Sequence, residues 1–128
     1  MLRSALKILL PAIVLLLVGC RIAPIYEVPQ AQLVAPRAVS MADVERAIRT
    51  AGASLGWQMV QRAPGHLEGT LILREHRAVV DIKYDTRYYS IKYKDSSGLS
   101  YDGTSVHTNY NGWVQNLERA IRAQVSAL

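Results

Sequence analysis

The sequence predicts an α+β fold: a two-layer sandwich in which two helices cover one face of a four-stranded antiparallel meander, in the order α-β-β-β-β-α. Two observations support this prediction. Apolar residues recur at helical spacing in segments that start near residues 40 and 109, and they alternate with polar residues along four runs between residues 57 and 94. The runs are joined by short connections, which favours antiparallel neighbours with one dry face. Two amphipathic helices would bury that face.

The first helix is expected to begin at Ser40. Its hydroxyl can cap the first turn, and Asp43 supplies both a capping box and a negative charge at the positive end of the helix. Gly56 marks the expected end. The side chains expected to face the core are Val44, Ala47, Ile48, Ala51 and Leu55.

The four alternating runs are predicted to be half-buried strands. The first two cover residues 57–62 and 66–74, and Pro64-Gly65 turns the chain between them. The dry face of the second is expected to carry Leu67, Gly69, Leu71 and Leu73. The dry face of the last two is expected to carry Ala78, Val80, Ile82, Tyr84, Tyr89, Ile91 and Tyr93.

An irregular stretch and a second helix complete the predicted fold. Residues 95–104 are rich in turn formers. The helix is expected from about Asn109, which would act as its N-cap. Its expected apolar stripe consists of Tyr110, Trp113, Val114, Leu117 and Ile121.

The amino-terminal residues have the layout of a secretory signal peptide. Arg3 and Lys7 precede an apolar run that contains Pro11 and has roughly half of the about 20 residues that a membrane-spanning helix needs. The run ends in Leu17-Val18-Gly19-Cys20, which contains the only cysteine and resembles the lipobox of bacterial lipoproteins. The resemblance implies cleavage between Gly19 and Cys20 and acyl chains, palmitate among them, on Cys20. The alternative is an uncleaved signal anchor with an incidental thiol.

Residues 20–39 are expected to form a lipidated tether, followed by one folded domain over residues 40–128. Prolines at 24, 29 and 36 favour extended backbone. At about 3.1 Å per residue, the tether could hold the domain up to roughly 60 Å from the bilayer. Because the segment is unusually apolar for a linker, part of it is expected to lie on the domain or on a partner.

Several strings in the body of the chain resemble a group of small, uncharacterised proteobacterial lipoproteins. They are Gly56-Trp57, Glu68-Gly69-Thr70-Leu71, Ala78-Val79-Val80-Asp81-Ile82, Ser90-Ile91-Lys92-Tyr93-Lys94-Asp95-Ser96-Ser97 and Asn109-Tyr110-Asn111-Gly112-Trp113. The resemblance covers nearly the whole mature domain. It implies an envelope location but no particular activity. The resemblance further implies that, in Gram-negative lipoproteins, an Asp after the cysteine favours inner-membrane retention. Arg21 therefore indicates the outer membrane, with the domain facing the periplasm.

Charge gives no indication of a nucleic-acid partner. The net charge of +5 includes Arg3 and Lys7, which the signal peptide would remove. The remaining basic residues are interleaved with acids instead of forming a stripe. This weak basic bias suits anionic lipid or cell-wall surfaces.

The three histidines, His66, His76 and His107, are not spaced as metal ligands on one helix. His66 and His76 stand at opposite ends of one predicted strand, about 33 Å apart at ~3.3 Å per residue, so they cannot share a metal ion. We expect exposed histidines in turns, and neither a metal site nor a cofactor.

The sequence also predicts a protein without enzymatic activity. Ser105, His107 and Asp102 include the residue types of a catalytic triad, but no G-x-S-x-G elbow surrounds the serine. Asp81 and Asp85 share a strand face with basic residues, which favours a solvated charge ladder over a pair of catalytic carboxylates.

A candidate binding patch consists of Tyr88, Tyr101, Asn109 and Asn111. Aromatic planes combined with amide groups suit a glycan or a peptide strand. The alternative is that each residue has a local role, with Asn109 as a helix cap and Tyr88 as a cross-strand partner.

These observations together predict a membrane-anchored envelope lipoprotein that acts as a non-enzymatic binding or scaffolding module. Its partner would be an envelope protein engaged by the polar sheet face or by an exposed edge strand. The alternatives are a peptidoglycan-binding, glycan-binding or hydrolytic module that uses residues 101–111, and a purely structural role.

Overall fold

A computed structural model describes residues 21–128 of the chain. The expected signal peptide, its cleavage site and Cys20 lie outside the described residues. The elements, in chain order, are β1 (Ile22–Pro24), β2 (Val28–Gln32), α1 (Met41–Ser54), β3 (Gln58–Ala63), β4 (His66–Leu73), β5 (His76–Tyr84), β6 (Tyr88–Ser97), β7 (Ser105–His107) and α2 (Thr108–Ser126).

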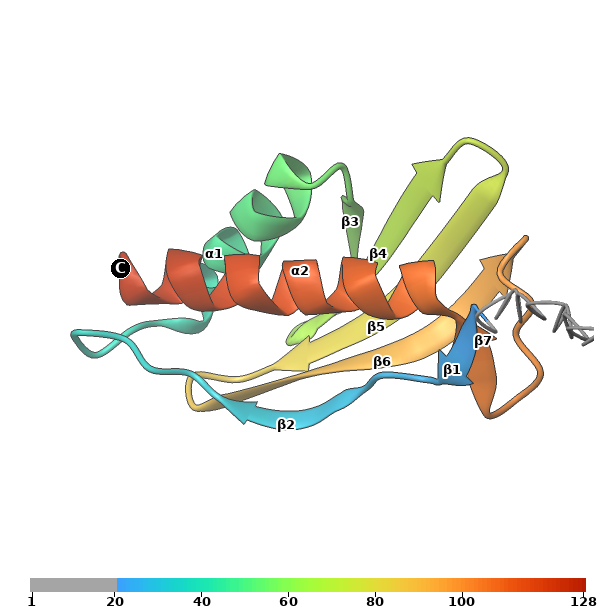
Figure 1. Cartoon of the computed structure of the whole chain (residues 1–128). Coiled ribbons are helices and arrows are strands. Elements are labelled where there is room, and N and C mark those ends of the chain that lie inside the picture. The colour runs from blue at the N-terminus through green and yellow to red at the C-terminus, as the bar shows by residue number, and fades with distance from the viewer. Residues whose placement is uncertain (1–20) are drawn as a thin grey trace, which may run out of the picture.

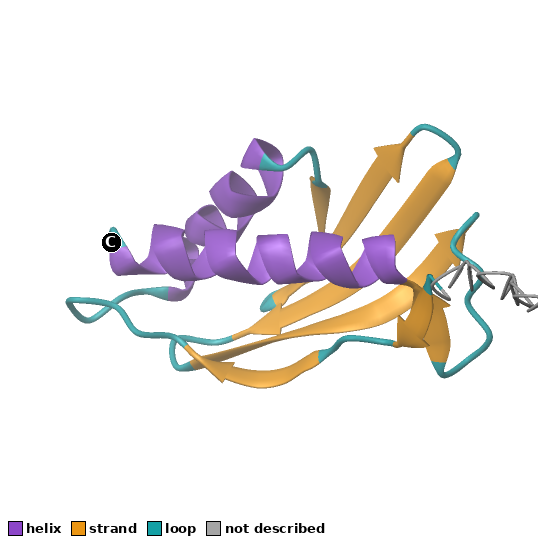
Figure 2. Cartoon of the chain, in the orientation of Figure 1, coloured by secondary structure: helices purple, strands orange, loops and turns teal. Residues whose placement is uncertain are grey.

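The main sheet has five strands in the order β2-β6-β5-β4-β3, and β1 pairs with β7 in a separate two-stranded sheet. All of these pairings are antiparallel. Both helices lie on one face of the main sheet (Figures 1 and 2). The α+β class is therefore confirmed, and the meander of β3 to β6 is as predicted, but the sheet has five strands instead of four.

The fifth strand comes from the segment that was expected to be a tether. Val28 pairs with Ile91 of β6 and is only 5% exposed, so it belongs to the core. Pro29 is compatible with this strand because β2 lies at the edge of the sheet, where a missing N–H is tolerated. The prediction that the folded part begins at Ser40 is therefore wrong, whereas the expectation that part of the segment lies on the domain is confirmed.

Helix α1 begins as the sequence predicts. The Ser40 hydroxyl accepts a hydrogen bond from the Asp43 N–H at 3.1 Å, and the Asp43 carboxylate accepts one from the Ser40 N–H at 3.1 Å. Gly56 follows the helix with a φ of 87°, a left-handed conformation that glycine adopts without strain. Leu55 is exposed, contrary to expectation, because it is the C-cap residue rather than part of the buried stripe.

Helix α2 begins at Thr108, and its N-cap is His107 instead of Asn109, two residues earlier than expected. The Nδ1 atom of His107 accepts a hydrogen bond from the Asn109 N–H at 3.1 Å. This cap arises because β7 leads directly into the helix without a linker. Of the predicted stripe, Trp113 is only partly buried, and the fully buried members are Tyr110, Val114, Leu117 and Ile121.

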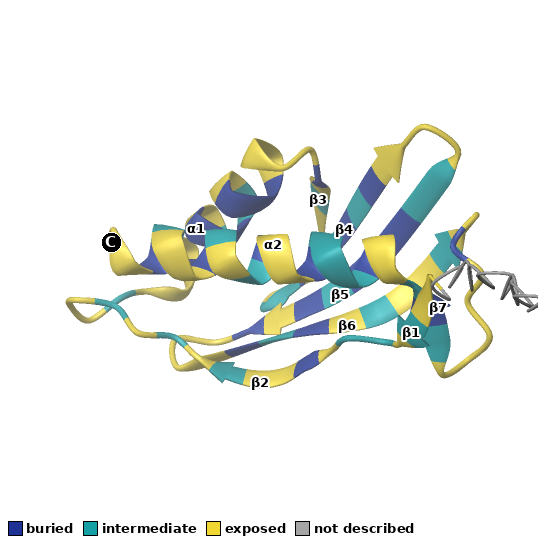
Figure 3. Cartoon of the chain, in the orientation of Figure 1, coloured by how far each residue is buried: buried dark blue, intermediate teal, exposed yellow. Residues whose placement is uncertain are grey.

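The core lies between the two helices and the inner face of the sheet (Figure 3). Apart from Leu73 and Tyr93, the large side chains predicted for the dry face of β4, β5 and β6 are buried. Tyr93 is partly buried and packs against the core. Leu73 is 49% exposed because it is the last residue of β4, beside the turn at Arg74 and Glu75.

Candidate functional site

The outer face of the sheet, on the side away from α1 and α2, carries a connected set of charged side chains. Arg62 of β3 pairs with Glu68 of β4 at 2.9 Å, and Lys94 of β6 reaches the same carboxylate at 2.5 Å. Lys94 also lies 3.8 Å from Asp81 of β5, and Asp81 contacts the Nε2 atom of His66 at 2.6 Å. We call these five residues the outer-face network.

Alternation in four neighbouring strands produces this network, because every second side chain of β3 to β6 faces away from the helices. Two hydrogen bonds, from Arg62 and then from Lys94, lower the pKa of Glu68 to about 2. Glu68 therefore stays ionised at neutral pH. Arg62 and Lys94 then face the carboxylates of Glu68 and Asp81, so the positive and negative charges of the network cancel. The two cationic side chains stay accessible to solvent.

The predicted charge ladder exists, but its members differ. Asp81 joins it through neighbouring strands, whereas Asp85 accepts hydrogen bonds at 2.7 Å from the backbone N–H groups of Arg87 and Tyr88. Asp85 is thus part of the turn between β5 and β6. Arg77 instead pairs with Asp95 at 2.9 Å.

Hollows lie beside this face and elsewhere on the domain. A hollow of about 200 Å³ adjoins the network and is lined by Asp81, Lys83, Ser90, Lys92 and Tyr93. Another of about 300 Å³ lies at the ends of the strands, where Tyr88 and Asp85 form part of its wall together with Pro29. An apolar groove of about 350 Å³ lies elsewhere, between residues 32–34 and the end of α2.

The structure does not gather the four residues of the predicted patch. Tyr88 is at the start of β6 and pairs with Gln32. Tyr101 lies beyond the other end of β6, where its ring stacks on Tyr93 with the centroids 3.9 Å apart. Tyr88 and Tyr93 are five residues apart along the strand, which is about 17 Å.

Asn111 and Asn109 have structural contacts of their own. The side-chain oxygen of Asn111 accepts a hydrogen bond from the Tyr26 N–H at 2.8 Å, and its nitrogen donates one to the Pro24 carbonyl at 2.9 Å. Both halves of the amide therefore hold the amino-terminal segment. Asn109 contributes its backbone N–H to the His107 cap.

The amino-terminal segment is fixed from the first described residue, and we call residues 21–26 the N-terminal seat. The Thr108 N–H donates to the Arg21 carbonyl at 2.8 Å, and the Ile25 N–H donates to the Thr104 carbonyl at 3.0 Å. The Tyr26 hydroxyl donates to Glu118 at 2.5 Å. Sequence patterns gave no signal for these contacts, because each joins residues about 80 or more positions apart.

The fold brings two of the histidines together. The rings of His76 and His107 are stacked with centroids 6.4 Å apart, and Trp113 lies 6.3 Å from His76. The Nδ1 atom of His76 is 2.8 Å from the Gly98 carbonyl. Within residues 21–128, no three His, Cys, Asp or Glu side chains converge as they would around a metal ion.

No protein-family model, curated protein or solved structure matches this chain. Neither α1 nor α2, the helices of the described part of the chain, is long and apolar enough to cross a bilayer.

Proposed function

We propose that this protein is a lipid-anchored envelope lipoprotein that acts as a non-enzymatic binding or scaffolding module. The lipobox-like string Leu17-Val18-Gly19-Cys20 supports the anchor and the location. The observation that supports binding is the outer face of the sheet, where the outer-face network lies beside a hollow of about 200 Å³.

The composition of this face suits a protein partner. Val60 is 47% exposed and belongs to β3, a strand that contributes Arg62 to the network. A non-obligate protein interface is about as apolar as the rest of a protein surface, so this mixture of aliphatic and charged side chains is compatible with a protein partner. Strand β3 is also an edge of the main sheet, so a partner strand could extend the sheet there.

The ionisation of Glu68 favours a binding role over a catalytic one for that carboxylate. A general acid or base works best with a pKa near the operating pH, and Glu68 is shifted in the opposite direction, to about 2. Its two cationic neighbours hold it as a fixed charge. A partner with complementary charges could exchange contacts with Arg62 and Lys94 without any chemical step.

The alternative of a glycan-binding or hydrolytic module has its best support at Tyr88. That ring is 41% exposed and lines the hollow of about 300 Å³ with Asp85 and Ser90. Asn111 gives the alternative no support, because its amide is already engaged with the N-terminal seat.

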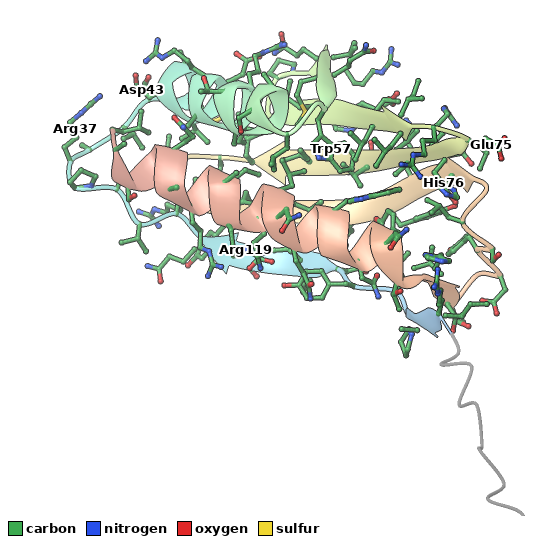
Figure 4. The ribbon with its side chains drawn as sticks, turned by 45° about the horizontal axis from the view of Figure 1, so that its top comes forward. Arg37, Asp43, Trp57, Glu75, His76 and Arg119 are labelled. Atoms are coloured by element: carbon green, nitrogen blue, oxygen red, sulfur yellow. The ribbon has the colours of Figure 1, made fainter. Side chains whose placement is uncertain are left out.

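Photo-crosslinking in the native envelope tests the proposal. A photoreactive residue at Lys92, on the outer face, is expected to capture one specific envelope protein, and Lys92→Glu is expected to weaken that complex at least several-fold. The same photoreactive amino acid placed at Arg119, which is exposed on α2 (Figure 4), serves as the control and is expected to capture no specific protein. Equal or absent capture at the two positions would contradict the proposal.

Incubation with purified peptidoglycan tests the alternative. Retention that is lost in Tyr88→Ala supports a glycan site at the strand ends. If peptidoglycan does not retain the unsubstituted protein, the glycan-binding alternative is wrong.

A further inference from the structure

We infer that one end of the domain lies directly on the bilayer surface, with Ile72 and Leu73 at the turn between β4 and β5 entering the phospholipid headgroup region. This inference rests on the proposed acylation of Cys20, and it adds an orientation and a contact surface to the anchor.

The proposed anchor residue lies next to the folded domain. Arg21 directly follows Cys20, and its carbonyl already accepts a hydrogen bond from the Thr108 N–H at 2.8 Å. Consecutive Cα atoms are about 3.8 Å apart, so the acylated residue would lie within one residue of the folded body. The expected long tether is missing, and the domain therefore cannot stand far from the lipid.

Several contacts fix the place where the proposed anchor leaves the domain. The N-terminal seat is held by β-pairing of Ile22 with His107 and by the amide of Asn111. The hydrogen bond from Tyr26 to Glu118 ties the end of the seat to the middle of α2. Because the seat is fixed at several points, the anchor leaves the domain in a fixed place, and the same end of the molecule always faces the bilayer.

The β4–β5 hairpin turn lies at the same end of the domain as the anchor point. Ile22 pairs with His107, the ring of His107 stacks on His76, and His76 pairs with Leu73 across the β4–β5 hairpin. This series of contacts connects the anchor point to the hairpin turn. In Figure 1, β1 and this turn lie at the end of the molecule away from the carboxyl terminus, and in Figure 4, Glu75 and His76 lie at the end opposite Arg37.

The chemistry of this end suits a phospholipid surface. Its exposed apolar side chains include Ile22 at 43%, Ile72 at 63% and Leu73 at 49%. Arginine side chains can reach headgroup phosphates while their stems lie along apolar surface, and both Arg21 and Arg74 are exposed here.

Net charge contributes little to this contact. Glu75 at the turn and Asp102 in the loop before β7 balance the two arginines. Apolar insertion is therefore the main contribution, and the contact is expected to change little with ionic strength or with the anionic lipid content.

Fluorescent labelling of the acylated protein tests the inference. Leu73→Cys is labelled with an environment-sensitive dye and placed in phosphatidylethanolamine–phosphatidylglycerol vesicles that contain headgroup-level quenchers. We expect a blue-shifted emission that is quenched several-fold more than that of Val34→Cys. Val34, 70% exposed, lines the apolar groove at the end of α2 and is the matched control. Ile72→Cys is a second reporter at the same turn, so misfolding of one variant does not remove the test.

The unsubstituted protein separates a failure of the anchor from a failure of the orientation. Its only cysteine is Cys20, so uptake of dye shows a free thiol and overturns the proposed acylation. If the unsubstituted protein takes up no dye and stays with the vesicles, but the labels at residues 72 and 73 are quenched no more than the label at residue 34, the anchor stands and the orientation is wrong.

Discussion

The side-chain nitrogen of Asn111 donates a hydrogen bond of 2.9 Å to the carbonyl oxygen of Pro24, across 87 positions of the chain. The same amide also accepts the Tyr26 N–H. Asn111, which the sequence suggested for a binding patch, thus holds the amino-terminal segment on the domain. In the proposed lipoprotein, these hydrogen bonds fix how the anchor meets the folded body.

Replacing Asn111 by alanine is expected to loosen the N-terminal seat. Two hydrogen bonds are lost and the backbone groups of residues 24 and 26 lose their partner, so the free energy of unfolding should fall by about 1–3 kcal/mol. Amide hydrogen exchange should speed up most at residues 22–26. Asn109→Ala is the matched control, because its capping contact uses the backbone N–H and survives the substitution. Unchanged exchange in Asn111→Ala would contradict this role.

The outer-face network predicts a loss of stability in acid. The pKa of Glu68 is about 2 in the folded protein, below its ordinary value of 4.5, so its ionised form is favoured by folding. Its contribution is fully present above about pH 4.5 and is lost as the pH falls toward 2. Urea unfolding of Glu68→Gln across this range should therefore show a shallower pH dependence than the unsubstituted protein. Identical slopes would mean that the pairs with Arg62 and Lys94 do not form.

Tyr89 presents a buried hydroxyl that has no hydrogen-bond partner within residues 21–128. Burial raises its pKa to about 12. Because the hydroxyl loses its contact with water and gains no partner, Tyr89→Phe should be neutral or should stabilise the protein by about 1 kcal/mol. The matched control is Tyr93→Phe, which removes a hydroxyl that lies 2.7 Å from the Ser96 hydroxyl and should destabilise by about 1 kcal/mol. Thermal and urea unfolding measure the stability of both variants. If Tyr89→Phe is less stable than Tyr93→Phe, this account of Tyr89 is wrong.

Local patterns predicted the elements whose causes are local. The capping box of Ser40 and Asp43 lies within four residues, and the alternation along β4 to β6 extends over eight to ten residues per strand. Strands β1, β2 and β7 have only three to five residues, and two of them contain a proline. Their formation depends on distant partners, such as Ile91 for Val28, which no short window of sequence contains.

The candidate site was predictable to a smaller extent, for the same reason. A charge ladder on the outer face follows from alternation, and Asp81 does belong to it. Which cation reaches which carboxylate depends on the register between strands, and Glu68 and Lys94 are 26 positions apart. The separation of Tyr88 from Tyr101, and the meeting of His76 with His107, are likewise set by the tertiary fold.

We propose that acyl chains on Cys20 anchor a domain whose fold begins at the next residue or the one after it. The intact mass of the native protein, extracted from membranes with detergent, tests this claim most directly. We expect a chain that begins at Cys20 and carries a diacylglyceryl group, with or without an additional acyl chain on its amino terminus. A chain that begins at Met1 with an unmodified cysteine would contradict the account.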